Sequence, residues 1–190
     1  QVWGLNNPAS GALGPHDRVA DLTDATAVAA AIEDIRPDAV VHLAAIAFVA
    51  HGSADDFYRV NLMGTRNLLD ALARAGCGSK GVVLASSANI YGNTRVSPIP
   101  ETAPPAPAND YAVAKLAMEH MAGLFAGKLP LVIVRPFNYT GLGQSPKFLV
   151  PKIVSAFRER APRLELGNLD VARDFSDVRD IVEQYLQLLQ

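Results

Sequence analysis

The chain has 190 residues, of which 49% are hydrophobic and 19% charged, and its formal net charge is -2. This length allows one domain with a buried core, while the balanced charge argues against the clustered Lys and Arg of a nucleic-acid-binding surface. No apolar run reaches the length of a membrane span, no signal peptide opens the chain, and a single cysteine excludes an internal disulfide, so we expect a cytoplasmic protein without nucleic-acid or membrane partners.

Helix and strand patterns alternate along the chain, which predicts an α/β fold with a parallel sheet. Short apolar runs indicate strands, and longer stretches bounded by capping residues, Gly or Pro indicate helices. The expected elements, in chain order, are a strand at 1–5, a helix at 24–35, a strand at 38–45, a helix at 55–75, a strand at 80–87, a helix from 109–110 to about 126, a strand at 131–136, a helix at 148–160, a short strand at 163–167 and a helix at 177–189.

Tyr111 and Lys115 lie four residues apart and therefore on one face of the expected helix. The preceding strand ends at Ser87, and both segments should reach the carboxyl edge of the sheet, where open α/β sheets bind ligands. A nearby cation favours the phenolate and lowers the Tyr pKa from about 10, so Tyr111 could exchange a proton with a sugar hydroxyl or carbonyl near neutral pH. We therefore expect Ser87, Tyr111 and Lys115 to be catalytic. The histidines lack metal-ligand spacing, and no metal is expected.

Seven short segments, taken in chain order, resemble motifs of the extended short-chain dehydrogenases/reductases, the NAD-dependent epimerase/dehydratase family. The segments that carry the resemblance are Asp21-Leu22, 41–45 (VHLAA), 60–70 (VNLMGTRNLLD), 86–92 (SSANIYG), 111–115 (YAVAK), 135–138 (RPFN) and 173–178 (RDFSDV). The resemblance implies a Rossmann-like, doubly wound NAD(P)-binding domain at 1–140, followed at 141–190 by part of a small substrate-binding region whose last helix could pack back on the first domain. The first strand and Gly-rich loop of such a domain are expected to be absent from this chain.

The resemblance also implies which residues contact the cofactor. These are Asn6, Asp21, Leu22, Leu43, Ala44, Ala45, Tyr111, Lys115, Pro136 and Phe137. Asn6 stands where many NAD enzymes carry an acid that repels a 2′-phosphate, so we expect NAD or NADP, with the balance toward NADP. The alternatives are a turn Asn for Asn6, a helix-capping region for Asp21 and ordinary strand packing for residues 43–45.

The expected substrate contacts are Ser87, Asn89, Asn138 and Arg173, again by resemblance. The planar guanidinium of Arg173 suits a diphosphate, although it could instead pair with Asp174 or Asp177. Asn61 is expected either near the active site or as a buried Asn whose hydrogen bonds are satisfied within the core.

Ala88 and Asn89 occupy positions where dehydratases of the family carry acids, and neither side chain can transfer a proton, so dehydration is not expected. The segments 135–144 and 167–180 resemble GDP-4-keto-6-deoxy-mannose reductases. We therefore expect an NAD(P)-dependent nucleotide-sugar oxidoreductase that reduces the C4 ketone of a GDP-4-keto-6-deoxy-hexose. The alternatives are a 4-epimerase of the UDP-glucose/galactose type and a non-catalytic NAD(P)-sensing protein. The helices at 55–75 and 111–126 are expected to form a homodimer, as in the family.

Overall fold

The structure, a computed structural model, describes residues 1–11, 14–47, 53–167 and 169–189. The chain divides into two compact units. Unit 1 is formed by Gln1–Arg135 together with the chain end from Leu188, and unit 2 is formed by Pro136–Gln187.

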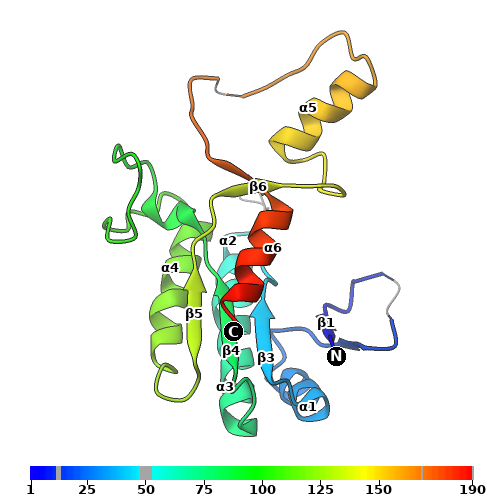
Figure 1. Cartoon of the computed structure of the whole chain (residues 1–190), viewed down its shortest axis with the longest axis vertical. Coiled ribbons are helices and arrows are strands. Elements are labelled where there is room, and N and C mark those ends of the chain that lie inside the picture. The colour runs from blue at the N-terminus through cyan, green and yellow to red at the C-terminus, as the bar shows by residue number, and fades with distance from the viewer. Residues whose placement is uncertain (12–13, 48–52, 168, 190) are drawn as a thin grey trace. The chain divides into compact units, whose positions relative to one another are not determined.

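Parallel strands form the scaffold of unit 1 (Figure 1). One sheet has the order β3-β4-β5, with strands β3 (Ala39–His42), β4 (Gly81–Ala85) and β5 (Leu131–Val134). A second, separate pair consists of β1 (Gly4–Asn6) and β2 (Asp17–Val19). Because all these pairs are parallel and helices connect the strands of the larger sheet, the predicted α/β fold is confirmed.

The helices of unit 1 begin and end at residues suited to those positions. They are α1 (Ala25–Ile35), α2 (Ala54–Asp56), η1 (Phe57–Gly64), α3 (Thr65–Ala75), η2 (Ala88–Tyr91) and α4 (Asp110–Gly123). The Asp24 carboxylate accepts hydrogen bonds from two backbone N–H groups in the first turn of α1, and the Asn109 side chain caps α4 by accepting from the Ala112 N–H. Gly76 ends α3 in a left-handed conformation (φ 62°), which glycine adopts without steric cost.

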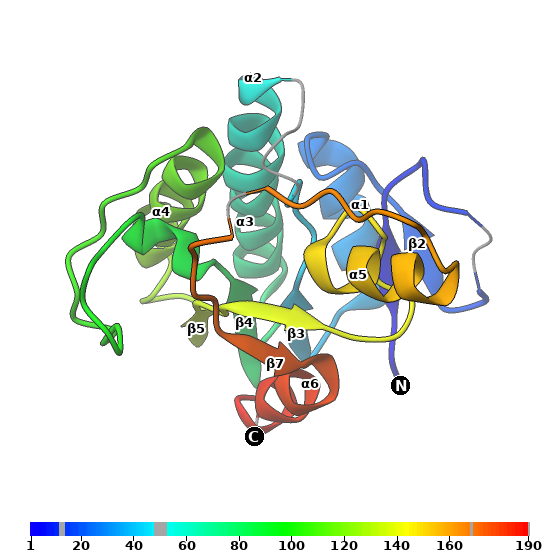
Figure 2. The ribbon, with the colours of Figure 1, turned by 90° about the horizontal axis from the view of Figure 1, so that it is seen from above.

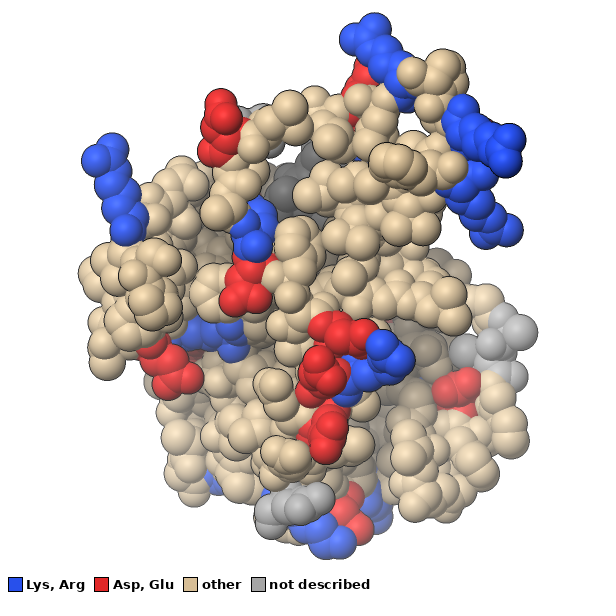
Figure 3. Space-filling model, turned by 45° about the horizontal axis from the view of Figure 1, so that its top comes forward, with Lys and Arg blue, Asp and Glu red and all other residues tan. Residues whose placement is uncertain are grey.

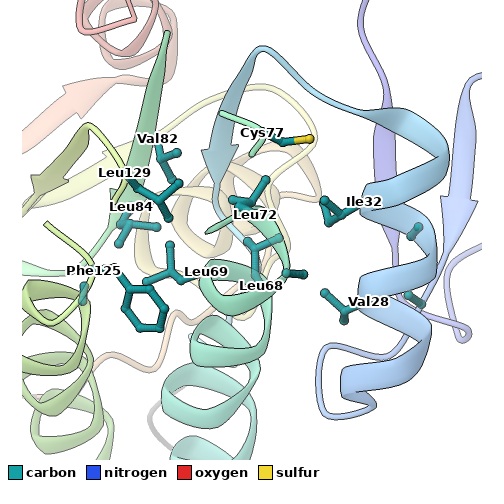
Figure 4. Packing of buried hydrophobic residues seen from close by; sticks show 14 of the residues in the cluster. Val28, Ile32, Leu68, Leu69, Leu72, Cys77, Val82, Leu84, Phe125 and Leu129 are labelled. Atoms are coloured by element: carbon teal, nitrogen blue, oxygen red, sulfur yellow. The ribbon is translucent and has the colours of Figure 1, made fainter. Parts of the chain in front are cut away.

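One hydrophobic core joins three helices to the sheet. Figure 2 shows α1, α3 and α4 side by side along one face of the β3-β4-β5 sheet. In Figure 4, Leu68, Leu69 and Leu72 of α3 lie between Ile32 of α1 and Phe125, just after α4. Core residues with no exposed surface include Val28, Leu69, Leu72, Val82 and Leu84. This core fixes the helix that carries the expected catalytic pair against the strand that ends near Ser87.

The predicted long helix at 55–75 is present, but its middle is not α-helical. Residues Phe57–Gly64 form a π-helix, in which each backbone hydrogen bond spans five residues instead of four. Gly64 lies against Leu22, where a Cβ would come within 2.9 Å of the Leu22 Cβ. The wider winding thus accompanies a close approach between this helix and the segment after β2.

The described part of unit 2 forms one short strand pair and two helices. They are β6 (Asn138–Thr140), α5 (Leu149–Arg158), β7 (Phe175–Asp177) and α6 (Val178–Gln187), with β6 and β7 parallel. The prediction of a strand at 163–167 is wrong, because this segment has no strand partner among the described residues. Instead, the Glu165 carbonyl accepts a hydrogen bond from the Lys152 ammonium at 2.6 Å.

The described surface carries both signs of charge. Figure 3 shows Lys and Arg side chains and Asp and Glu side chains interspersed with uncharged surface on the face in view. Several are exposed ion pairs, such as Arg74 with Asp70 at 2.9 Å, and pairs of this kind contribute little to stability. None of the helices in the described ranges combines the length and apolar character that crossing a lipid bilayer would need. Within the same ranges, no group of three or more His, Cys, Asp or Glu side chains could hold a metal ion.

Candidate functional site

Lys115 reaches from α4 to the carboxyl end of β4. Its ammonium donates a hydrogen bond to the Ala85 carbonyl at 2.7 Å, and the residue is only 5% exposed. Burial lowers the pKa of Lys115 to about 8, while the charge of Glu119, one helical turn further on, opposes that shift. Ala85 is two residues before Ser87, so the buried ammonium lies at the strand end where the sequence predicts chemistry.

Tyr111 lies one helical turn before Lys115 and is also buried. Its ring packs edge-on against Phe57 of η1, with ring centroids 6.0 Å apart, and Ile46 and Tyr58 pack against the same cluster. The Tyr58 hydroxyl donates to the carboxylate of Asp110, the first residue of α4, at 2.8 Å. The π-helix therefore holds both the ring of Tyr111 and the beginning of the helix that carries it.

Two adjacent serines end β4 with different surroundings. The Ser87 hydroxyl accepts a hydrogen bond from the Asn89 backbone N–H at 3.2 Å, which caps η2. The Ser86 hydroxyl is buried and has no hydrogen-bond partner among the described residues. Buried hydroxyls normally find a partner, so this one marks a position where a ligand or water could bind. Asn89 itself is exposed.

The segment after β3 is accessible at its beginning and fixed at its end. Leu43 is 58% exposed and Ala44 is exposed, whereas Ile46 is held by Asn61 of η1. The Asn61 amide accepts from the Ile46 N–H at 2.8 Å and donates to the Ile46 carbonyl at 3.0 Å. Asn61 has no exposed surface, so the structure favours the alternative of a satisfied core Asn. Its effect is to fix the backbone beside the small residues Ala44 and Ala45.

His42, the last residue of β3, is buried in a hydrogen-bonded chain. Its Nε2 lies 2.9 Å from the Thr65 hydroxyl, which donates its own hydrogen to the Asn61 carbonyl at 2.7 Å. Nε2 must therefore carry the hydrogen in this contact. Burial, together with the charge of Lys115, lowers the pKa of His42 to about 4, so the imidazole is neutral at pH 7.

Asp21 and Leu22 follow β2 and are held by local hydrogen bonds. One Asp21 carboxylate oxygen accepts from both the backbone N–H and the hydroxyl of Thr23 at 2.8 Å, and these bonds lower the Asp21 pKa. Asp24, not Asp21, caps α1. The Leu22 carbonyl accepts from Asn67 of α3 at 2.9 Å. These contacts fix the turn in which an adenine contact is predicted.

Asn6, at the end of β1, is hydrogen-bonded to the carboxylate of Asp17, a contact that the sequence patterns did not indicate. Its amide donates to the Asp17 carboxylate at 3.0 Å, and the second oxygen of Asp17 accepts from the Gly14 N–H at 2.6 Å. The parallel register sets Asp17 beside Gly4, and a Cβ on Gly4 would collide with the Asp17 carboxylate. Only the pairing of β1 with the unpredicted strand β2 reveals this contact.

The remaining predicted residues belong to unit 2. Phe137 is 41% exposed, and the Asn138 amide donates to the Asp174 carbonyl at 3.0 Å. Arg173 donates to the Ala172 carbonyl at 3.0 Å. Asp177, one of the partners considered for Arg173, instead pairs with Arg179. Pro136 directly precedes Phe137 and is partly buried.

Comparison with known proteins gives a consistent result. Residues 2–190 match the model of the NAD dependent epimerase/dehydratase family. GDP-6-deoxy-D-talose 4-dehydrogenase of Aggregatibacter actinomycetemcomitans is 41% identical over 169 residues, which cover 89% of this chain and 58% of the relative. GDP-6-deoxy-D-mannose reductase of Pseudomonas aeruginosa is 42% identical over 168 residues, which cover 80% of this chain and 54% of the relative. The chain thus spans little more than half the length of these relatives.

Solved structures resemble it over nearly the whole chain. A crystal structure from Burkholderia cenocepacia J2315 is 52% identical with a TM-score of 0.89, and the match covers 98% of this chain and 62% of that one. The structure of RMD from Pseudomonas aeruginosa complexed with NADPH is 34% identical with a TM-score of 0.81, covering 94% and 65%. With the family match extending from residue 2 to 190, this chain belongs to the NAD-dependent epimerase/dehydratase family.

Proposed function

We propose that this protein is an NAD(P)-dependent nucleotide-sugar oxidoreductase that reduces the C4 ketone of a GDP-4-keto-6-deoxy-hexose. The observation that carries the proposal is the buried pair Tyr111 and Lys115 on one face of α4, with the Lys115 ammonium on the Ala85 carbonyl just before Ser87. The two curated relatives, both named for GDP-6-deoxy sugars, support the choice of substrate class.

Several of the described residues offer contacts that suit a nicotinamide dinucleotide. The partnerless Ser86 hydroxyl and the buried Lys115 ammonium offer hydrogen-bonding groups, and exposed Leu43 and Ala44 leave the backbone accessible. Lys115 would bind the nicotinamide ribose, and Pro136 and Phe137 would flank the ring. When bound, the cofactor supplies or accepts a hydride at the C4 carbon of the sugar.

The choice between NAD and NADP depends on two opposing features at the end of β1. Asn6 has no charge to repel a 2′-phosphate, but Asp17 brings a carboxylate to within 3.0 Å of its amide. Solved relatives of both kinds exist, since RMD is complexed with NADPH and the WbmG enzyme of Bordetella bronchiseptica is in complex with NAD. We therefore propose NAD(P) as the cofactor.

Each catalytic group has a distinct role in this proposal. Tyr111 donates a proton to the C4 oxygen as hydride reaches C4, which gives the alcohol. The positive charge of Lys115 stabilises the tyrosinate left behind. Ser87 orients the ketone, and because its oxygen accepts a hydrogen bond from the Asn89 N–H, its own hydrogen is available for the C4 oxygen.

The nucleotide-sugar would be held by Asn89, Asn138 and Arg173. Dehydration is disfavoured, since Ala88 and Asn89 provide no acid. We also propose that the protein forms a homodimer through the helical segments at 55–75 and 111–126, because apolar side chains on these segments remain exposed in the single chain. These are Met63 at 47%, Val113 at 38% and Leu124 at 79% exposed.

A 4-epimerase is the second candidate, because the same three side chains would serve it and UDP-glucose 4-epimerase 2 of rice is 33% identical over 178 residues. An epimerase would retain its nicotinamide and return the hydride to the other face of the sugar. A non-catalytic NAD(P)-sensing protein is less well supported, because Ser87, Tyr111 and Lys115 are all present.

The test uses the full chain with NADPH or NADH and GDP-4-keto-6-deoxy-mannose. Loss of reduced cofactor in proportion to a 4-hydroxy product, identified by NMR, would support the reductase, and the faster cofactor would set the preference. Interconversion of UDP- or GDP-hexose 4-epimers with catalytic NAD, without net consumption, would show an epimerase instead. In the variant Tyr111→Phe, turnover should fall at least about 100-fold while cofactor binding is retained.

A further inference from the structure

A partly buried ion pair lies one helical turn beyond Lys115. Glu119 of α4 is 8% exposed, and both of its carboxylate oxygens accept hydrogen bonds from Arg135, the residue after β5. Arg135 Nε lies 3.1 Å from one oxygen, and its Nη2 lies 2.6 Å from the other. Such a two-point contact fixes the orientation of the carboxylate as well as its position.

Arg135 is held from its other side too. Its Nη1 donates to the Tyr91 hydroxyl at 2.7 Å and to the Glu101 carbonyl at 3.1 Å. The guanidinium carbon also lies 5.4 Å from the centre of the Tyr91 ring. Arg135 therefore connects α4 to η2 and to the loop after it, and this arrangement sets where the Glu119 carboxylate points.

The spacing of Lys115 and Glu119 makes that orientation important. Residues four apart on a helix are neighbours, and opposite charges at this spacing attract each other. The Lys115 ammonium nevertheless donates to the Ala85 carbonyl, at the strand end near Ser87, while Arg135 occupies both oxygens of Glu119.

We propose that Glu119 and Arg135 are a positioning pair for the active site, in which Arg135 withholds the Glu119 carboxylate from Lys115 and so keeps the ammonium at the Ala85 carbonyl beside Tyr111. The inference rests on the proposed function for its catalytic meaning, but the effect on Lys115 is a property of the chain alone. Neither Glu119 nor Arg135 touches the reacting atoms in this account.

Removing the charge of Glu119 and removing the charge of Arg135 should shift the Lys115 pKa in opposite directions. On α4, Tyr111 and Glu119 lie at helical spacing on either side of Lys115. Glu119 acts on the Lys115 pKa, and the Lys115 charge acts on His42 of β3, which is neutral at pH 7. Glu119 opposes the lowering of the Lys115 pKa by burial, so loss of its charge should take that pKa below about 8. Loss of the Arg135 charge should do the reverse, because the unpaired carboxylate then acts fully on Lys115.

The experiment follows the titration of Lys115 itself in the full chain, with no cofactor or substrate present. Competitive labelling of lysines across a pH series, read by mass spectrometry of the peptide that contains Lys115, gives its midpoint in each variant. A one-unit fall in Glu119→Gln would raise labelling at pH 7 about fivefold, and a one-unit rise in Arg135→Gln would lower it about tenfold. The double variant should follow Glu119→Gln, since no carboxylate remains.

The exposed i, i+4 pair of Asp70 and Arg74 supplies a matched control, because Arg74→Gln also breaks a helix ion pair and should leave the Lys115 midpoint unchanged. Midpoints that do not move, or that move in the same direction in both single variants, would overturn the proposal. If Arg135→Gln does not fold, Arg135→Lys keeps the charge but not the two-point contact, and its midpoint should lie above that of the unaltered chain.

The same variants separate this inference from the proposed function. If the midpoints move as expected and the pH profile of turnover with GDP-4-keto-6-deoxy-mannose moves with them, both stand. The midpoints could instead move while neither the unaltered chain nor any variant turns over a 4-keto nucleotide sugar. In that case the positioning pair stands and the proposed reaction is wrong.

Discussion

The two units of this chain contain helices of similar length but differ in how those helices are buried. In unit 1, α1, α3 and α4 share a core with the sheet, and several of its side chains have no exposed surface. In unit 2, α5 has no buried residue, and Val154 and Phe157 are 59% and 77% exposed. A shared core, not helix length, is thus what fixes the elements that carry Tyr111 and Lys115.

The contrast should appear most strongly in a pair of identical substitutions. Leu69→Ala in unit 1 removes a fully buried side chain and should lower the free energy of unfolding by about 2–5 kcal/mol. Leu149→Ala in unit 2 removes a side chain that is 45% exposed and should change it by less than about 1 kcal/mol. Urea unfolding of both variants measures the difference, and equal losses would contradict the contrast.

Backbone strain provides the next largest effect. Gly92 has φ 60°, and a Cβ there would lie 1.9 Å from the Ala106 carbonyl oxygen, so Gly92→Ala should lower the free energy of unfolding by roughly 2–4 kcal/mol. Gly123, at the end of α4, has open space around its Cβ position and serves as the control. Gly123→Ala should be neutral or slightly stabilising, and thermal unfolding distinguishes the two. A tolerated Gly92→Ala would mean that the 92–106 contact does not order this loop.

Buried charge distinguishes the units in a third way. The Lys115 pKa is about 8 in the folded chain, below the 10.5 of an exposed lysine, so below pH 8 the folded state carries an ammonium that burial disfavours. That cost is relieved as pH rises from 8 to 10.5. Lys115→Met should therefore raise the free energy of unfolding at pH 7, on the order of 1–2 kcal/mol, while abolishing turnover. Lys152→Met in unit 2, with no comparable burial, should raise it far less, and a destabilised Lys115→Met would refute this account.

The smallest effect at neutral pH is expected at His42. Its pKa falls from 6.5 to about 4 on folding, so the unfolded chain binds more protons between these values, and stability should be lost as pH falls through that window. The slope should be about 1 kcal/mol per pH unit. His42→Gln keeps a donor for Thr65 but cannot titrate, so its unfolding free energy should lack this slope. Denaturant unfolding of the unaltered chain and of His42→Gln at pH 7 and pH 5 measures this slope. Equal losses of unfolding free energy in the two proteins would mean that another group causes it.

Much of unit 1 could be predicted from the sequence, because its pattern is local. The Tyr111 and Lys115 spacing, the Asn109 cap and the apolar strand before Ser87 all lie within a few residues of one another, and the structure contains each helix and strand that they predict. The family resemblance is likewise confirmed. The catalytic and binding roles assigned to individual residues stay predictions.

Features that depend on distant pairing could not be predicted. Strands β2, β6 and β7 have three residues each, too few for a period-two pattern, and each exists only because another strand lies beside it. Conversely, residues 163–167 alternate as a strand would, but no described strand lies beside them. The bond between Asn61 and Ile46 and that between Glu119 and Arg135 join residues 15 and 16 positions apart, and no local pattern reports them.

The π-helical winding of residues 57–64 bears on how this segment can change during evolution. A π-helix can arise by inserting one residue into an α-helix, and deleting one would restore regular winding. Such a deletion would rotate the residues that precede it in the helix, among them Phe57 and Tyr58, by about 100° relative to α3. Phe57 would then leave Tyr111, and Tyr58 would leave Asp110. Substitutions in this segment change one side chain at a time, but a one-residue gap in an alignment of close relatives would signal that the packing around Tyr111 differs.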